Sequence, residues 1–320
     1  MSGPGAGRER SEVLALHLFN HRFEANLPVL DTLYAGRFPR RHVLMPFASN
    51  PGPDISRVHD AGRNFAAFFA EAARDFLSDD ISHYVVIPDD LLLNPQIDAG
   101  NIAARLELCD GEAWINNLTS ADALRWRWPH AGEAAASFER YAKALDIGDL
   151  LPPADEARAR FEKLGVTFPG PHRPAMGERR KLWRQSKWCW LSALAMRGRP
   201  APYPLLAGYS DFLVIPGDRM EAFCHYCGVL GAMNIFAEVA VPTALALACD
   251  RVKTHQPLNT HFQGPEAQAA DPASLRPVAF WEQGDDADWR GLLAGDLDSI
   301  QEGFPEDVLF VHPVKLSRFA

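Results

Sequence analysis

The chain has 320 residues, of which 47% are hydrophobic and 23% charged, a balance typical of a globular protein and not of a disordered or collagen-like one. Its net charge of −9 argues against a dedicated nucleic-acid binder, since such proteins carry a basic surface. Five cysteines are too few for a disulfide scaffold and indicate a reducing, cytoplasmic compartment. The length alone allows one large domain or two small ones.

Neither a targeting segment nor a membrane span is evident. Residues 1–12 are mostly small and polar, lack the apolar run of a signal peptide, and are expected to be disordered. The best candidate span, residues 223–249, is interrupted by His225, Glu238 and Pro242. Its charge-free apolar part is far shorter than the roughly 20 residues that a span requires. We therefore expect a buried helical region there and no transmembrane helix.

The first 90 residues alternate apolar strands with helices. Strands are predicted over residues 13–19, 42–47 and 83–87, with helical spacing from Leu27 onward and an amphipathic helix over residues 64–77. This order favours an α/β fold, with a mostly parallel sheet flanked by helices. In such sheets ligands bind beyond the carboxyl ends of the strands.

The middle of the chain has a different pattern. Residues 129–204 contain no clear strand and predict helices, over 133–145 and 155–164, between proline-rich loops. We interpret this region as a helical insertion within a single domain that covers residues 13–320.

Strand character returns in the last third of the chain. A strand is predicted over residues 212–215 and another over 307–311. Between them, a long apolar helix is predicted over residues 220–247, with a bend or break expected at Pro242 because proline removes a helix hydrogen bond.

An acidic pair, Asp89 and Asp90, follows the third predicted strand and is the sharpest chemical signal. Two adjacent carboxylates at the carboxyl edge of a sheet suit Mg²⁺ or Mn²⁺, which also bind phosphate oxygens. The alternative is a solvated turn or a helix N-cap. The apolar residues on both sides of the pair favour the cation site.

The sequence around the pair resembles the Asp-x-Asp region of GT-A glycosyltransferases, whose fold is Rossmann-like. After the strand come Pro88, Asp89 and Asp90, then the apolar triplet Leu91–Leu93 and the pair Asn94–Pro95. Family members with three acids at this point show the same triplet and Asn-Pro. Pro88 replaces the first acid, which in the family usually helps to hold the metal or the ribose, so the requirement for a metal stays open.

Two further segments resemble the donor and acceptor regions of the same family. The loop after the first strand, with Phe19, Asn20 and Arg22, is similar to the segment that holds the nucleotide base and ribose. Residues 208–212 resemble the segment that binds the acceptor and faces the donor sugar.

The end of the chain also matches the family pattern. His312 resembles the late histidine that completes the metal shell, and Lys315 the nearby residue that binds the diphosphate. The resemblance implies that Asp90 and His312 hold Mn²⁺ or Mg²⁺ and that Asp89 or Asp90 contacts the metal or the donor ribose.

Two acids are candidates for the general base that activates the acceptor hydroxyl. Glu238 lies in an apolar helix, where burial would raise its pKa, and an acid at this place is the base in inverting GT-A enzymes. The alternative for Glu238 is a buried salt bridge. Asp211 is the competing base, and its alternative is a turn or cap residue.

Two other patterns invite a function. Cys224 and Cys227 have the spacing of a zinc ligand pair, but a structural zinc site needs four ligands, and buried cysteines are the favoured interpretation. Residues 173–199 carry eight Lys or Arg and three Trp against one acid. This stretch is either an amphipathic helix with Trp packed inward or a peripheral contact with an anionic glycolipid or membrane.

These patterns favour a bacterial GT-A glycosyltransferase of surface polysaccharide synthesis (lipopolysaccharide O-antigen or capsule). It would act in the cytoplasm or at the inner face of the membrane, on a nucleotide-diphospho-sugar, with UDP the expected nucleotide, and on a saccharide or glycolipid acceptor. The second hypothesis is a non-catalytic carbohydrate- or lipid-binding protein on the same fold, and a zinc-containing regulatory protein is the third.

Overall fold

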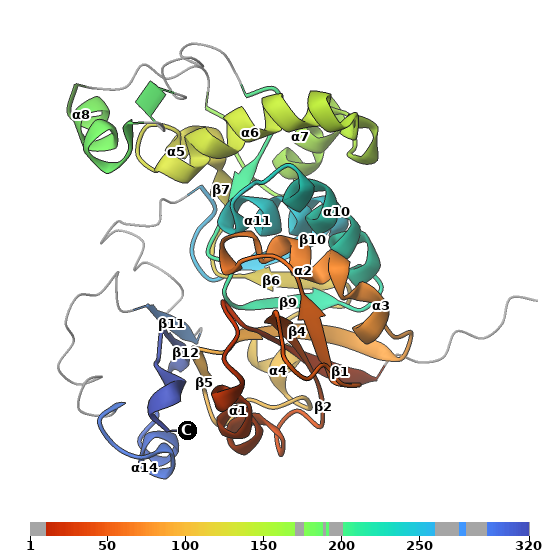
Figure 1. Ribbon diagram of the computed structural model, residues 1–320, viewed down its shortest axis with the longest axis vertical. Coiled ribbons are helices and arrows are strands. Elements are labelled where there is room, and N and C mark those ends of the chain that lie inside the picture. The colour runs from red at the N-terminus through yellow and green to blue at the C-terminus, as the bar shows by residue number, and fades with distance from the viewer. Residues whose placement is uncertain are drawn as a thin grey trace, which may run out of the picture.

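A seven-stranded sheet organises the part of the chain that the computed structural model describes, residues 11–169, 176–187, 190–191, 201–259, 275–279 and 293–319 (Figure 1). All neighbouring strands are parallel except at β9, which is antiparallel to both β4 and β6. In spatial order the strands are β10 (Arg251–Thr254), β6 (Glu112–Ile115), β9 (Leu213–Pro216), β4 (Ile81–Pro88), β1 (Glu12–Leu18), β2 (Arg40–Pro46) and β3 (Ile55–Val58). The predicted α/β class and mostly parallel sheet are confirmed.

The two faces of the sheet carry separate cores because successive side chains alternate between them. In β1, Leu14 and Leu16 join one core, while Val13 and Ala15 join the other. Figure 1 shows helices over both faces. The first core includes α2 (Ala66–Glu71), α3 (Ala73–Phe76), α10 (Met220–Ala232) and α11 (Ala237–Ala248), and the second includes α1 (Leu27–Tyr34), α4 (Ile102–Arg105) and α14 (Leu297–Glu302).

The prediction of one continuous helix over residues 64–77 is wrong. The segment forms a short 3-10 turn, η2 (Gly62–Asn64), and then α2 and α3, which are separated at Ala72 (φ −95°, ψ 2°). Helix α2 packs closely on α10, since a Cβ added at Gly231 would lie 3.1 Å from the Ala67 Cβ.

The expectation that residues 1–12 are disordered needs correction at its end, because Glu12 already belongs to β1. Residues 1–10 lie outside the described ranges.

The long apolar helix breaks between Met233 and Phe236, and not at Pro242 as predicted. Asn234 adopts a left-handed conformation (φ 54°), which ends α10. Pro242 lies inside α11 without ending it. A proline leaves the carbonyl four residues earlier without its helical donor. That carbonyl, of Glu238, accepts a hydrogen bond from Gly208 N at 3.1 Å, which satisfies it and ties α11 to the acceptor-like segment.

Helices and turns make up the described parts of residues 129–204, in agreement with the expected absence of strands there. They are α6 (Pro129–Leu145), the 3-10 turn η3 (Gly148–Leu150), α7 (Ala154–Lys163) and α8 (Met176–Gln185). Helix α5 (Ala121–Leu124) and the small pair of β7 (Thr119–Ser120) with β8 (Leu206–Ala207) connect this region to the sheet. Among the residues described, no helix combines the length and the apolar character needed to cross a membrane.

A second, three-stranded sheet returns the end of the chain to the acidic pair. Strand β12 (Val308–His312) pairs with β11 (Arg276–Ala279) and, in antiparallel orientation, with β5 (Leu92–Leu93). The side chain of Asn94 donates to the Val308 carbonyl at 2.7 Å, and its backbone N–H donates to the Leu309 carbonyl at 2.8 Å. The apolar triplet and the Asn of the motif therefore fix the position of β12.

The contact at Gly208 gives a first testable prediction. A Cβ added there would lie 2.4 Å from the Asn117 carbonyl oxygen, so Gly208→Ala must displace backbone. We expect Gly208→Ala to lower the free energy of unfolding by about 1–3 kcal/mol, measured by urea denaturation. Gly36→Ala is the control, because nothing lies within 4 Å of its added Cβ. Equal stabilities of the two variants would contradict the account of this contact.

Candidate functional site

The sheet has a topological switch point between β1 and β4. From β1 the chain passes to β2 and β3 on one side, and then returns to β4 on the other side of β1. Ligands of open α/β sheets bind at the carboxyl ends of the strands at such a point. Asn20 follows β1, and Asp89 and Asp90 follow β4. The Asp89 N–H donates to the Leu18 carbonyl at 2.8 Å, which holds the two strand ends together.

His312 reaches the acidic pair from the far end of the chain. Its Nε2 lies 3.0 Å from Asp90 Oδ1, although the two residues are 222 positions apart in sequence. The Val314 N–H donates to the Asp90 carbonyl at 2.6 Å and adds a backbone link at the same place. The pairing of β5 with β12 thus brings His312 next to the acidic pair.

The other ring nitrogen of His312 faces the acceptor-like segment. His312 Nδ1 is 2.5 Å from the Tyr209 hydroxyl and 3.9 Å from Asp211 Oδ2. Tyr209 is itself held by its N–H, which donates to Asn117 Oδ1 at 2.7 Å. The imidazole is therefore fixed between Asp90 and Asp211, and only 5% of the residue is exposed.

Burial and charge shift the pKa values of this cluster. Burial lowers the pKa of His312, but the carboxylates of Asp211, Asp90 and Glu238 outweigh it and hold that pKa above its ordinary value. Burial raises the pKa of Asp211, and nearby His312 offsets this in part. Without a bound cation, the site therefore favours the protonated imidazole of His312 and disfavours the ionised form of Asp211.

The two adjacent acids have different partners. Asp89 is only 4% exposed and accepts a hydrogen bond of 2.9 Å from Asn26 Nδ2, whereas Asp90 bonds to His312. Burial, followed by the charge of Asp90, raises the pKa of Asp89 to about 6.

A pocket of about 370 Å³ brings together three residues expected from the sequence: Asn20, Asp211 and Glu238. Glu238 is half-buried in the first turn of α11. The remaining lining residues are Gly62, Arg63, Phe65, Phe236 and Ala237. Both candidate bases thus face one cavity beside the switch point.

An aromatic group forms one side of this pocket. Phe236 stacks on the His130 ring, with centroids 4.1 Å apart, and meets the Trp128 ring at 5.9 Å. The guanidinium carbon of Arg63 lies 5.5 Å from the Phe236 ring centroid. A rigid, half-buried ring beside carboxylates can stack on the apolar face of a ligand while polar groups orient it.

The other residues expected at the site are placed less directly. The side chain of Phe19 is fully buried in the core, so the structure does not bring it to the cavity. Arg22 and Lys315 are exposed, on the loop after β1 and just after the Val314 link to Asp90, respectively. Glu238 lines the pocket, and its charge helps to raise the pKa of His312.

Four residues at the site were not singled out from the sequence: Asn26, Asn117, Tyr209 and Phe236. Asn26 precedes a helix and has the pattern of an N-cap, but its side chain makes no cap bond and holds Asp89 instead. Tyr209 lies in the acceptor-like segment, so its neighbourhood was expected although its contact with His312 was not.

The donor set fits a divalent cation only in part. Among the described residues, no group of three or more His, Cys, Asp or Glu side chains is arranged to hold a metal ion. Asp90 and His312 offer one oxygen and one nitrogen 3.0 Å apart. Mg²⁺ and Mn²⁺ are commonly bound by one or two protein groups together with substrate phosphates. A cation here would need oxygens from a bound diphosphate.

In the part of the chain that the structure describes, the cysteine pair has no further side chains arranged beside it to complete a zinc site. Cys224 and Cys227 are buried in α10. Burial raises the pKa of Cys224 to about 12 and that of Cys227 well above its ordinary value, whereas a zinc ligand must be a thiolate. Buried structural cysteines are the interpretation that fits.

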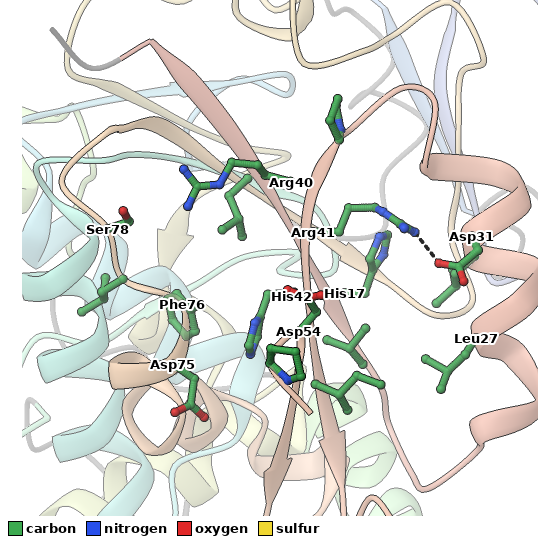
Figure 2. A pocket seen from close by; sticks show the side chains of 17 residues that line it. His17, Leu27, Asp31, Arg40, Arg41, His42, Asp54, Asp75, Phe76 and Ser78 are labelled. Atoms are coloured by element: carbon green, nitrogen blue, oxygen red, sulfur yellow. Dashed lines mark hydrogen bonds and ion pairs between the residues drawn. The ribbon is translucent and has the colours of Figure 1, made fainter. Parts of the chain in front are cut away.

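A larger hollow of about 630 Å³ lies around the start of β2, at the opposite end of that strand from the candidate site (Figure 2). Figure 2 shows Arg41 and His17 on one side of the strands and His42 with Asp75 on the other. Arg41 pairs with Asp31 at 2.7 Å, and His42 Nε2 lies 2.8 Å from the Ser56 hydroxyl. None of Asp90, Asp211, Glu238 or His312 lines this hollow, so it is separate from the candidate site.

Comparison with protein-family models gives no match, and comparison with curated proteins finds no significantly similar sequence. The geometry of the cluster and its pocket therefore carries the functional argument.

The raised pKa of Asp89 predicts that its ionisation destabilises the folded protein as pH rises. Because its folded pKa, about 6, exceeds its unfolded value of 3.8, its contribution to stability is present below pH 3.8 and is lost as pH rises through 6. In EDTA, we expect Asp89→Asn to gain stability relative to the native protein by about 1–2 kcal/mol between about pH 5 and about pH 8, measured by urea denaturation. A difference that does not change with pH would contradict this, and Asp31→Asn, with an exposed carboxylate, is the control.

Proposed function

We propose that the protein is a GT-A-type glycosyltransferase that moves a sugar from a nucleotide-diphospho-sugar, with UDP the expected nucleotide, to a saccharide or glycolipid acceptor. The reaction would serve bacterial surface polysaccharide synthesis from the cytoplasmic side. One observation carries the proposal: Asp90, Asp211, Glu238 and His312, from distant parts of the chain, surround the switch point of a mostly parallel sheet.

Charge explains why the donor diphosphate would require a cation here. The site contains several carboxylates that would repel phosphates, with the imidazole of His312 between Asp90 and Asp211. Lys315, exposed next to the Val314 link, supplies a positive group for the diphosphate. If Asp90, the neutral form of His312 and the diphosphate oxygens held it, Mn²⁺ or Mg²⁺ would neutralise the charge on the leaving nucleotide, and its binding would release the imidazole proton.

The donor nucleotide would lie along the loop after β1. Asn20 lines the pocket, and its backbone passes so close to Gly62 that a Cβ added there would lie 2.7 Å from the Asn20 carbonyl oxygen. Asp89, fixed by Asn26, would accept from the ribose, and exposed Arg22 would contact the nucleotide from the same loop.

The acceptor would enter the pocket beside Phe236, with its hydroxyl directed at Glu238. Asp211 lies 3.9 Å from His312 Nδ1, so it serves better to hold the imidazole than to move a proton. Glu238 would take the proton from the acceptor hydroxyl as that oxygen bonds to the anomeric carbon. The bond from the anomeric carbon to the phosphate oxygen breaks, and the nucleoside diphosphate leaves.

Transfer assays test the proposal directly. With purified protein, a panel of UDP-sugars and saccharide acceptors, we expect donor hydrolysis or transfer that depends on Mn²⁺ or Mg²⁺. Glu238→Gln should lower kcat by about 10²–10⁴-fold while donor affinity stays the same, because it removes only the base. Glu139→Gln, on the exposed face of α6, is the control. Full activity of the Glu238 variant would sink the assignment of the base.

Phe236 should act on the acceptor alone. Removing its ring takes away the stacking surface of the pocket, so we expect Phe236→Ala to raise the KM for the acceptor by about tenfold and leave the KM for the donor unchanged. Leu145→Ala, a truncation of an apolar side chain outside the pocket, is the control. A parallel rise in the donor KM would show that Phe236 belongs to the nucleotide subsite instead.

A further inference from the structure

Helix α8 and the residues just after it expose apolar and positive side chains together. Of six large hydrophobic side chains that are exposed in the described part of the chain, three lie here: Met176 (82%), Trp183 (43%) and Leu191 (46%). Because Trp183 is exposed, it does not pack inward as the alternative of an amphipathic helix requires. Around these residues lie five cations, at Arg179, Arg180, Lys181, Arg184 and Lys187.

The helical spacing gathers the two kinds of side chain on one face. Met176, Arg180 and Trp183 follow one another at intervals of one helical turn. The ammonium of Lys187 lies 5.6 Å from the Trp183 ring centroid, and the Trp190 ring meets Trp183 edge-on at 4.9 Å. Cation and indole therefore alternate along a single surface, which we call the α8 face (Met176, Arg180, Trp183 and Lys187).

Charge and composition indicate which kind of partner would bind the α8 face. The whole chain has a net charge of −9, so a local excess of five cations against the single acid Glu178 is a reversal of its overall sign. Interfacial helices that lie on anionic membranes combine Lys and Arg with Trp and other apolar residues. Trp is favoured at the depth of the lipid headgroups, where one end of its ring is apolar and the other polar. A folded protein core would not accommodate the positive groups.

The position of α8 leaves this face accessible. Figure 1 shows α8 at the periphery of the helical region formed by α5, α6 and α7, away from the seven-stranded sheet. Residues 170–175, 188–189 and 192–200, which complete the basic stretch in the sequence, lie outside the described ranges and are not part of the α8 face.

We propose that the α8 face is a docking surface for an anionic lipid bilayer. Met176 and Trp183 enter the headgroup region, while Arg180 and Lys187 contact lipid phosphates. This contact goes beyond the proposed transferase reaction and does not depend on it. It would place the protein beside acceptors that are carried on lipids.

Vesicle sedimentation tests the proposal with the full chain. We expect the protein to sediment with vesicles of phosphatidylcholine mixed with phosphatidylglycerol, and not with phosphatidylcholine alone. Binding should weaken as salt is added, because salt screens the attraction. Trp183→Ala and the double variant Arg180→Gln/Lys187→Gln should each weaken binding to anionic vesicles about tenfold.

Matched variants on α6 control for nonspecific effects. Leu145→Ala and Arg140→Gln change an exposed apolar and an exposed positive side chain elsewhere, and they should bind like the native protein. No sedimentation with anionic vesicles at low salt, or equal binding by the α8 and α6 variants, would overturn the proposal. If the α8 variants instead convert a dimer to a monomer in analytical ultracentrifugation, the α8 face is a contact between two copies of the chain.

Discussion

The return of His312 to Asp90 is the contact on which the rest of the candidate site depends. It requires β12 to pair with β5, and Asn94 to bond to β12 through both its side chain and its backbone. The apolar triplet before Asn94 is buried, so this connection lies in the core and not on a mobile surface. Rigid support of this kind holds a reacting geometry better than a loop would.

The site is assembled at a cost to the fold. Burial raises the pKa values of Asp89 and Asp211, which means that their charged forms are less stable in the folded protein than in water. In α11, Pro242 leaves the Glu238 carbonyl without its helical donor, and the Gly208 N–H donates to that carbonyl instead. That bond connects the candidate base to the acceptor-like segment, which contains Asp211. Polar groups that destabilise a fold are commonly retained where they bind or react.

Much of the architecture is predictable from the sequence, because apolar runs and their spacing report strands and helices directly. The acidic pair could be identified because it lies just beyond a predicted strand, at the edge where an open parallel sheet binds ligands. His312 was expected only from its resemblance to a family motif, because its strand lies in a second sheet and reaches the pair through β5. Local pattern failed where a tertiary contact decides, as at Pro242, which the Gly208 hydrogen bond accommodates. Asn26 was missed for the same reason, since its partner is 63 residues away.

Calorimetry of UDP binding tests the central claim most directly, because it measures the cluster without requiring the correct sugar or acceptor. We expect UDP to bind in the presence of Mn²⁺, to bind much more weakly in EDTA, and to lose the effect of the cation in Asp90→Asn. Binding of glycans with no affinity for UDP under either condition would contradict it, and would indicate a carbohydrate-binding protein on a transferase-like fold.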